Sequence, residues 1–422
     1  MTRRGFLKSV GVCALAAQVA GRAAAATRGK PNVVLIISDD QGYTDYGFMG
    51  HKVVRTPHLD SLASQSLVFT RGYVPTALCC PSLATMCTGL YAHQHRITGN
   101  DPVRRNERKA VYERFVKCPR LPEMLARAGY VSFQSGKWWM GHYSRGGFTD
   151  GMTVKGRHGE AGLTIGRKTM KPVLDFIDGA KTKGKPFFVW YAPFLPHTPH
   201  NPPQRLREKY KSAGKMAAYY AMCEWFDETC GQLLGHLDKQ GLADNTMVVY
   251  VCDNGWPAWA KGSPYDLGMR TPIMIRWPGR VKARTDKKTL ASSVDIVPTI
   301  LAACGQAAAD GMQGVDLLDA KALAKRKMIF GENFAHDMAD IDDPAKSLRA
   351  RVCIEGNWKL ILWVKQQPSV RHSGIRKPAD DVQLFDLAAD PTEKKNLAAQ
   401  HPQRVAAMTK RLNEWWSPAA RQ

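Results

Sequence analysis

The sequence predicts an α/β protein: a large, mostly parallel sheet flanked by helices, followed by a smaller C-terminal α+β subdomain. Three observations support this prediction. Short apolar runs alternate with helical stretches, several of these runs end at chemically reactive polar residues, and the pattern changes beyond about residue 325. The 422 residues, 44% of them hydrophobic, are enough for a large core, and the 23% charged residues are an ordinary globular share.

Four runs of β-branched and aromatic residues have the length and composition of strands that are buried on both faces. They comprise residues 33–37, 130–134, 187–191 and 247–251. Helical stretches lie between them, at residues 59–66, 121–128, 171–180 and 217–240. Such alternation is typical of a parallel sheet covered by helices, and open sheets of this kind bind ligands beyond the carboxyl ends of their strands. We therefore expect the polar residues that follow these four strands to converge at one edge.

The last hundred residues have a different pattern of short strands and a terminal helix. The predicted strands comprise residues 328–330, 351–354, 359–363 and 383–387, and the helix residues 400–416. We therefore predict a catalytic domain over residues 27–325 and a C-terminal subdomain over residues 326–422, with a small antiparallel sheet.

The N-terminus has the charged, apolar and small-residue regions of a removable export signal. Arg3 and Arg4 precede Phe-Leu-Lys, which indicates the twin-arginine route. The alternative, a membrane anchor, is disfavoured because the apolar stretch of residues 9–21 is short and rich in alanine. Cleavage is expected after Ala24, Ala25 or Ala26. The mature chain would then be periplasmic or secreted, and no later segment of the sequence resembles a transmembrane helix.

The charge balance is strongly basic, with 60 basic against 37 acidic residues and a net charge of +23. Removal of residues 1–26 takes away four basic residues and no acids, so the mature charge is +19. A basic surface attracts polyanions: nucleic acid, anionic lipid or an acidic polysaccharide. The sequence lacks zinc fingers, basic helices and aromatic-basic repeats, so we expect no nucleic-acid partner.

The ten cysteines show no zinc-binding spacing. Cys13 lies in the signal, which leaves nine in the mature chain, and an odd number predicts at least one free or chemically special cysteine in an exported protein. The sequence does not determine any pairing.

Two acidic strand ends predict a metal site. Asp39 and Asp40 follow the first strand, and adjacent carboxylates repel each other unless a cation lies between them. Taken alone, the pair would more often be a turn with a helix cap. Asp253 and Asn254, at the end of a second buried strand, shift the balance towards a metal. Oxygen ligands of this kind favour calcium or magnesium.

Cys79 is expected at the N-terminus of a helix, because Pro81 suits a first turn and Thr88-Gly89 a helix end. Exposed backbone amides at that position favour negative charge and would activate a nucleophile. The alternative is a small, buried, inert thiol, which is the commonest fate of a free cysteine.

At this point the sequence resembles the type I, formylglycine-dependent sulfatases of the alkaline-phosphatase superfamily. The family pattern is Cys-x-Pro-Ser-Arg followed by x-x-x-Leu-Thr-Gly, and nearly the whole mature chain shows family-like blocks in the right order. The matching segments are PNVVLIISDDQGYTDYG, TPHLDSLASQSLVFTRGYV, LCCPSLATMCTGLYAHQHRITGN, SGKWWMGHY, PHTPHNPP, CDNGWPAWAKGSPYDLGMRTP and LFDLAADPTEKKNLA. The resemblance implies an alkaline-phosphatase-like fold and hydrolysis of a sulfate ester, and the basic charge favours a sulfated carbohydrate as its substrate.

The same resemblance implies roles for individual residues. One calcium ion would be bound by Asp39, Asp40, Cys79, Asp253 and Asn254. A maturation enzyme would oxidise Cys79 to formylglycine, whose hydrate attacks sulfur. The transferred sulfate group would be held by Lys137, His197 and Lys261, with His200 a second histidine beside it, and His197 and Lys261 would assist the leaving oxygen.

Two positions depart from the family pattern. Leu83 occupies the position of the motif arginine, and Trp139 occupies the position of the histidine in Gly-Lys-Trp-His. Either other residues compensate, with His142, Arg96 and His95 as candidates, or the activity on sulfate esters is reduced or lost. The intact metal ligands and cysteine favour activity. Phosphodiester or phosphonate hydrolysis on the same scaffold, and non-catalytic binding of sulfated glycans, remain alternatives.

Overall fold

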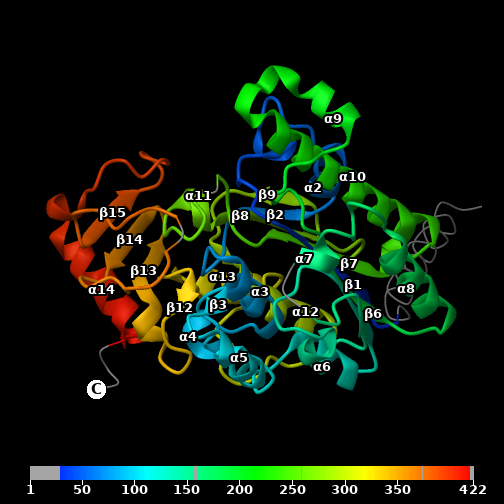
Figure 1. Cartoon of the computed structure of the whole chain (residues 1–422), viewed down its shortest axis with the longest axis horizontal. Helices are drawn as coiled ribbons and strands as arrows, with labels where there is room; N and C mark the ends of the chain where they lie inside the picture. Colours follow the sequence, from blue (N-terminus) through cyan, green and yellow to red (C-terminus); the bar gives the residue numbers. More distant parts are fainter. Residues whose placement is uncertain (1–28, 156–158, 258, 373, 419–422) are drawn as a thin grey trace, which may run out of the picture.

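The computed structural model describes residues 29–155, 159–257, 259–372 and 374–418. The proposed export signal therefore lies outside the described residues, and so does its cleavage site. A large α/β body is joined to a smaller C-terminal sheet that lies beside it (Figure 1). Among the described helices, none is long and apolar enough to cross a membrane.

Within the described residues, nine strands form the large sheet, in the order β10-β2-β8-β7-β1-β6-β4-β5, with β9 also paired to β2. Their bounds are β1 Asn32–Ser38, β2 Leu67–Tyr73, β4 Val131–Gly136, β5 Asp150–Gly151, β6 Phe187–Ala192, β7 Thr246–Cys252, β8 Arg270–Arg276, β9 Arg284–Asp286 and β10 Ala291–Ser292. The four predicted strands are β1, β4, β6 and β7, and they pair in parallel in the middle of the sheet. The sequence patterns did not reveal β2 and β8, and β8 runs antiparallel to both of its neighbours.

Helices cover both faces of this sheet, because the side chains of each strand alternate between two hydrophobic cores. On β1, Val33, Leu35 and Ile37 face one core, whereas Val34 and Ile36 face the other. Helices α3, α6 and α12 contribute to the first core, and α2, α8 and α10 to the second. All five β1 side chains are at most 2% exposed, which explains why this strand is apolar without interruption.

Helices α2, α6, α8, α10 and α14 match the five predicted stretches to within a few residues at their ends, and α3 begins at Cys79 as expected, whereas the other helices were not predicted. Their bounds are α2 Pro57–Ser64, α3 Cys79–Thr88, α4 Ala92–His95, α5 Arg108–Phe115, α6 Leu121–Arg127, α7 Gly159–Gly162, α8 Lys171–Thr182, α9 Gln204–Lys209, α10 Ala217–Lys239, α11 Asp266–Met269, α12 Ile296–Ala303, α13 Ala320–Lys325 and α14 Pro402–Trp415. Short 3-10 turns occupy Gly47–Met49, Arg105–Glu107, Tyr143–Gly146, Lys211–Met216, Ala243–Asn245, Ser293–Asp295, Pro344–Ser347 and Ala398–Gln400.

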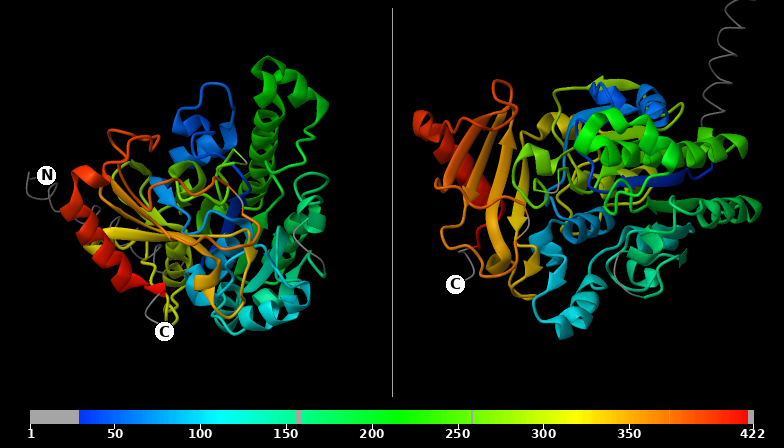
Figure 2. Two further views of the ribbon diagram at one scale, coloured as in Figure 1. Left: turned by 60° about the vertical axis from the view of Figure 1, so that its left-hand side comes forward. Right: turned by 45° about the horizontal axis from the view of Figure 1, so that its top comes forward.

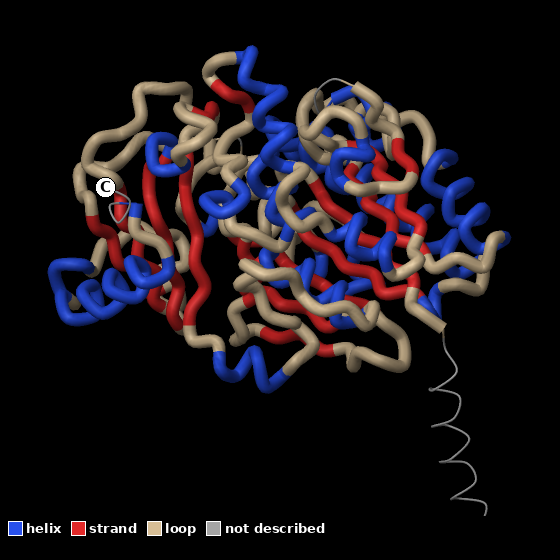
Figure 3. The backbone as a smooth tube through the Cα atoms, turned by 90° about the horizontal axis from the view of Figure 1, so that it is seen from below, coloured by secondary structure: helices blue, strands red, loops and turns tan. Residues whose placement is uncertain are grey.

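The C-terminal region forms a four-stranded antiparallel sheet in the order β11-β13-β14-β15. Its strands are β11 Met328–Phe334, β13 Leu348–Glu355, β14 Trp358–Trp363 and β15 Val382–Asp386. Helix α14 packs Met408 and Leu412 against this sheet, and Figure 2 shows the helix lying along its face. The predicted fold class is thereby confirmed, and Figure 3 shows the two sheets as separate groups of strands. A two-stranded parallel pair, β3 Asp101–Pro102 and β12 Asp337–Met338, links the two regions.

Candidate functional site

The polar residues that follow β1, β4 and β7 converge at the carboxyl edge of the large sheet, as the strand pattern predicts. They meet the N-terminal end of α3 and the loop between β7 and α11 there. The side chains brought together are Asp39, Asp40, Cys79, Lys137, His197, Asp253, Asn254 and Lys261.

Asp39 and Asp40 both reach this site although successive residues of a strand point to opposite faces. The chain leaves β1 at this point, and Asp40 adopts a left-handed conformation with φ of 55°. Aspartate tolerates this region better than most residues because its short polar side chain bonds locally. The backbone N–H of Asp40 donates to Asp253 Oδ1 at 3.2 Å, which ties the two strand ends together.

Asn254 is placed by a close approach of backbones behind it. A Cβ at Gly255 would lie 1.9 Å from the carbonyl oxygen of Leu267, so only glycine fits there. Asn254 Nδ2 donates to Asp40 Oδ1 at 2.5 Å, and the Asn254 Oδ1 lies 3.5 Å from Cys79 Sγ. The amide therefore connects the acidic pair to the cysteine.

Lys137 follows a second position that requires glycine. Gly136 ends β4 with φ of 85°, and a Cβ there would meet the carbonyl oxygen of Ala192 at 2.0 Å. The Lys137 ammonium is fully buried between two carboxylates, donating to Asp39 and, at 2.8 Å, to Asp253 Oδ2. Burial lowers the pKa of Lys137, but Asp253 and Asp39 raise it by more, so the side chain stays charged.

Two more basic groups face Asp40. Lys261 Nζ lies 2.8 Å and 3.0 Å from the two oxygens of Asp40, and His197 Nε2 lies 3.3 Å from Asp40 Oδ2. Burial raises the pKa of Asp40, but Lys261, His197 and Lys137 together lower it to well below its usual range. Asp40 is therefore ionised at every physiological pH.

The pKa values of Asp39 and Asp253 shift in the opposite direction to that of Asp40, because the effect of burial exceeds the effect of the nearby lysines. Burial raises the pKa of each to about 6, even though Lys137 acts in the opposite direction. Burial also lowers the pKa of His197 to about 4, with Asp40 opposing this shift. Both nitrogens of His197 face acceptors, since Nδ1 lies 2.6 Å from the carbonyl oxygen of Thr198.

Cys79 begins α3, as predicted, but the predicted activation of its thiol is wrong. The side chain is 2% exposed, and burial raises the pKa of the thiol to about 12 although Lys137 and Lys261 lower it. Loss of solvation on burial raises the pKa of the thiol more than the backbone amides at the helix N-terminus lower it, so an unmodified Cys79 is a neutral thiol. Within the described residues, none of the nine cysteines forms a disulfide.

The donor set fits a divalent metal ion. One ligand atom each from Asp39, Asp40 and Cys79 lie within 4.8 Å of one another, and all three residues are buried. Asp39 Oδ2 is buried without a hydrogen-bond partner. Three carboxylates face only two lysine ammonium groups, so one negative charge and one orphaned oxygen remain for a cation. Oxygen ligands at this density suit calcium.

The structure places the other predicted residues outside this cluster. His200 packs behind His197, with its ring 5.3 Å from Trp256 and 5.7 Å from Tyr219. Leu83 and Trp139 are both 2% exposed and belong to the first hydrophobic core.

The three residues considered as replacements for the missing arginine and histidine show no bond to the cluster. His95 is fully buried, its Nε2 3.2 Å from the hydroxyl of Thr85, and burial lowers its pKa to about 3. His142 contacts the hydroxyl of Ser144 at 2.9 Å, and Arg96 ends α4 in a left-handed conformation. In this structure none of the three takes the place of the family residues.

Two supporting residues were missed by sequence reasoning, because each acts on backbone groups and no spacing pattern marks it. Asn100 Oδ1 accepts from the backbone N–H of Cys80 at 3.0 Å, next to Cys79. Arg167 donates to the carbonyl oxygens of Phe194 at 3.0 Å and of His197 at 2.7 Å. The guanidinium also bonds the carbonyl oxygen of Pro199 at 3.0 Å and Asn201 Oδ1 at 2.6 Å, so it fixes the loop that carries His197.

The fold and the site together define an α/β protein with a buried cluster of charged residues at the carboxyl edge of its sheet, and the fold matches that of Ps i-CgsB (TM-score 0.74, 23% identity, 92% and 93% coverage). The family model described as Sulfatase matches residues 31–306, and one described as N-sulphoglucosamine sulphohydrolase, C-terminal, matches residues 254–417. The chain belongs to the sulfatase family and is a sulfuric-ester hydrolase.

The chain is also similar in sequence or in fold to individual known proteins. The chain is 24% identical to an N-acetylgalactosamine-6-O-sulfatase of Bacteroides thetaiotaomicron, over 91% of this chain and 92% of that protein. It shares its fold with BT4656, solved with its substrate D-glucosamine-2-N,6-O-disulfate (TM-score 0.72, 19% identity, 93% and 100% coverage). It also shares its fold with a phosphonate monoester hydrolase of Agrobacterium radiobacter (TM-score 0.68, 20% identity, 91% and 95% coverage).

Proposed function

We propose that this enzyme hydrolyses a sulfate ester on a sulfated carbohydrate, with a formylglycine made from Cys79 and one bound calcium ion. The observation that carries the proposal is the buried cluster itself: a cysteine at a helix N-terminus, 3.5 Å from Asn254 and surrounded by three carboxylates and two lysines. The relatives of known substrate include enzymes that act on sulfated amino sugars. The basic net charge of the chain is complementary to a polyanionic carbohydrate.

The neutral thiol of Cys79 supports a modified nucleophile. A group with a pKa of about 12 is almost wholly protonated at neutral pH, and the thiolate is the reactive form of cysteine. A hydrated formylglycine would supply one hydroxyl that attacks sulfur and expels the alcohol, and a second whose deprotonation releases sulfate and restores the aldehyde. Water therefore never needs to attack sulfur directly.

The remaining residues of the cluster have roles that follow from their charges. Lys137 and Lys261 hold two fixed positive charges beside Cys79, where negative charge on the transferred sulfate group is stabilised in a water-poor site. His197 would donate from Nε2 to the leaving alcohol oxygen when its ring is protonated, a form that Asp40 stabilises and burial opposes. Calcium would be held by Asp39, Asp40, Asp253 and Asn254 with the modified Cys79, and would supply Lewis-acid stabilisation of the attacking oxygen.

The decisive experiment is mass spectrometry of the peptide that contains Cys79, from protein made in its native host. We expect the mass of formylglycine in place of cysteine, which would also show that the maturation enzyme accepts Leu83 in the recognition motif. Active protein that carries only unmodified thiol would contradict the formylglycine mechanism. The same preparation tests export, because its N-terminus should begin after Ala24, Ala25 or Ala26.

A phosphonate or phosphodiester hydrolase is the second candidate, favoured by the shared fold of the Agrobacterium phosphonate hydrolase. Paired assays on an aryl sulfate and an aryl phosphodiester distinguish the two, and the sulfatase proposal expects the higher kcat/KM on the sulfate. Higher turnover of the phosphodiester would favour the second candidate. Affinity for sulfated glycans without turnover of either ester would instead indicate a binding protein.

A further inference from the structure

Asn254 and Lys261 lie at the two ends of one loop, and both belong to the buried cluster around Cys79, which we call the reaction centre. Both of these side chains bond to Asp40. Between them, the ring of Trp256 stacks on Tyr219 with centroids 4.6 Å apart and planes 17° apart. Ala260 is fully buried and closes a turn through a 2.7 Å hydrogen bond from its N–H to the carbonyl oxygen of Pro257. The described residues of this loop, 254–257 and 259–261, are therefore tied to the reacting group at both ends.

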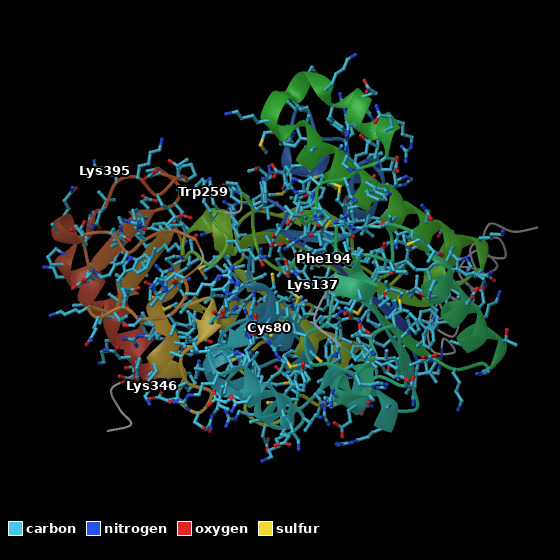
Figure 4. All side chains as sticks on the ribbon, viewed as in Figure 1. Cys80, Lys137, Phe194, Trp259, Lys346 and Lys395 are labelled. Carbon is cyan, nitrogen blue, oxygen red and sulfur yellow. The ribbon has the colours of Figure 1, made fainter. Side chains whose placement is uncertain are left out.

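Trp259 projects from this fixed loop into solvent. Its side chain is 58% exposed, and it is the only aromatic residue among the exposed large hydrophobic residues of the described chain. Figure 4 shows it between the C-terminal region and the body of the molecule. Leaving an indole ring in water forgoes the burial that stabilises most tryptophans, so folding alone does not account for this residue. A flat apolar ring with one N–H is a suitable surface for a ring-shaped, partly apolar ligand.

A basic segment of the C-terminal region adjoins the same loop. Gly374 lies so close that a Cβ there would meet the carbonyl oxygen of Lys261 at 2.4 Å. Residues 365–377 around it include Lys365, Arg371, Arg376 and Lys377 and no acidic residue. Lys377 is paired with Asp381, whereas the side chain of Arg371 is exposed. The backbone of this basic segment thus adjoins, at Lys261, the loop that carries Trp259.

We propose that Trp259 and Arg371 form a second subsite, which binds a further sugar ring of an anionic oligosaccharide beside the ring whose sulfate is removed. The indole would stack on the C–H face of that ring, and Arg371 would pair with a sulfate or carboxylate group on it. This inference rests on the proposed function for the identity of the neighbouring site. It adds that the substrate is an oligosaccharide rather than a single sulfated sugar.

Binding measurements test this proposal independently of turnover. Titration calorimetry would use the Cys79→Ala protein with sulfated mono- and tetrasaccharides prepared from carrageenan, chondroitin sulfate and heparin. We expect at least one tetrasaccharide to bind more tightly than its monosaccharide. Adding Trp259→Ala should lower the affinity for that tetrasaccharide about tenfold and leave the affinity for the monosaccharide unchanged. Trp259→Phe should give an intermediate affinity for the tetrasaccharide.

Matched variants separate the subsite from general electrostatic attraction. Arg371→Ala should lower the affinity for the sulfated tetrasaccharide several-fold. Arg411→Ala removes the same charge from the exposed face of α14 and should change that affinity little. The proposal is overturned if no tetrasaccharide binds more tightly than its monosaccharide, or if Trp259→Ala leaves every tetrasaccharide affinity unchanged. Trp259-dependent binding in a protein whose wild type releases no sulfate would uphold the subsite and refute the proposed sulfatase activity.

Discussion

The reaction centre and the boundary between the two sheets each bury a lysine among carboxylates, but they satisfy those charges differently. At the boundary, Lys359 of β14 lies 3.0 Å from Asp266 and 2.8 Å from Glu393. Glu393 also accepts from the backbone N–H of Asp266 at 2.6 Å, and Arg270 lies 3.5 Å from Asp266. Two acids therefore face two basic residues, and Glu393 Oε1, which accepts no hydrogen bond, still lies 2.8 Å from the Lys359 ammonium.

The reaction centre lacks this balance. Three aspartates face two lysines, and Asp39 Oδ2 has no partner although it is fully buried. Unpaired buried charge is costly, so a folded protein keeps it only where something else is bound or reacts. The boundary cluster joins two parts of the fold, whereas the unpaired charge of the other cluster is the charge that the proposed cation would neutralise.

The largest expected effect comes from removing the thiol at the reaction centre. Cys79→Ala should lower kcat/KM on a sulfate ester by about a thousandfold or more, because the nucleophile is lost while the lysines and carboxylates stay. Cys80→Ala is the matched control, since it deletes the neighbouring buried thiol, and it should keep activity to within a few-fold. Equal loss in both variants would show that the helix end, and not the Cys79 side chain, had been damaged.

Calcium should distinguish the two clusters in a stability measurement. At a hundred times its dissociation constant, a single bound ion raises the free energy of unfolding by about 2.7 kcal/mol. We expect denaturant titrations to show such an increase for the wild type and for Glu393→Gln, and to lose it in Asp253→Asn. If Glu393→Gln instead abolished the increase in unfolding free energy with calcium, the ion would bind at the boundary cluster, and the contrast between the two clusters would be wrong.

Most of the fold could be predicted, because β1, β6 and β7 are continuous apolar runs of the kind found in a parallel sheet covered on both faces, and β4 follows the same alternation with helices although it contains Ser132 and Gln134. β2 and β8 were missed because each mixes polar residues into a shorter apolar pattern, such as Thr70 and Arg71 in β2. The charged residues of the reaction centre were predictable because they lie after strand ends or within segments that resemble sulfatase motifs. Arg167, Asn100 and the boundary cluster were not, because their partners are distant in sequence or belong to the backbone.

The pH dependence of stability tests the boundary cluster further. Burial raises the pKa of Glu393 to about 7, although Lys359 lowers it, whereas an unfolded glutamate titrates near 4.5. The stability contributed by the neutral form is therefore complete below pH 4.5 and is lost as the pH rises through 7. The unfolding free energy of the wild type should fall relative to Glu393→Gln, by at most about 1.4 kcal/mol per pH unit in this window. Parallel curves for the two proteins would show that the pKa of Glu393 is close to its unfolded value.

Arg167 differs from the lysines of both clusters, because its bonds run to backbone carbonyl groups and the side chain of Asn201 instead of to carboxylates. If it positions His197, Arg167→Ala should reduce kcat about tenfold with little change in KM, since the leaving oxygen loses an aligned proton donor. Arg167→Lys keeps the charge but not the planar set of donors, so it should restore only part of the rate.

Arg205 provides the control for this last prediction, because it is exposed and pairs with the half-buried Glu228 on a neighbouring helix, so Arg205→Ala should leave kcat unchanged. The pH profile of kcat separates positioning from simple destabilisation. A misplaced His197 should shift the limb that reports its proton transfer, whereas a loosened fold would lower the rate equally at every pH. Full activity in Arg167→Lys would mean that the charge near Asp39 matters more than the hydrogen bonds. The reaction centre would then be stabilised by pairing of opposite charges, as the boundary cluster is.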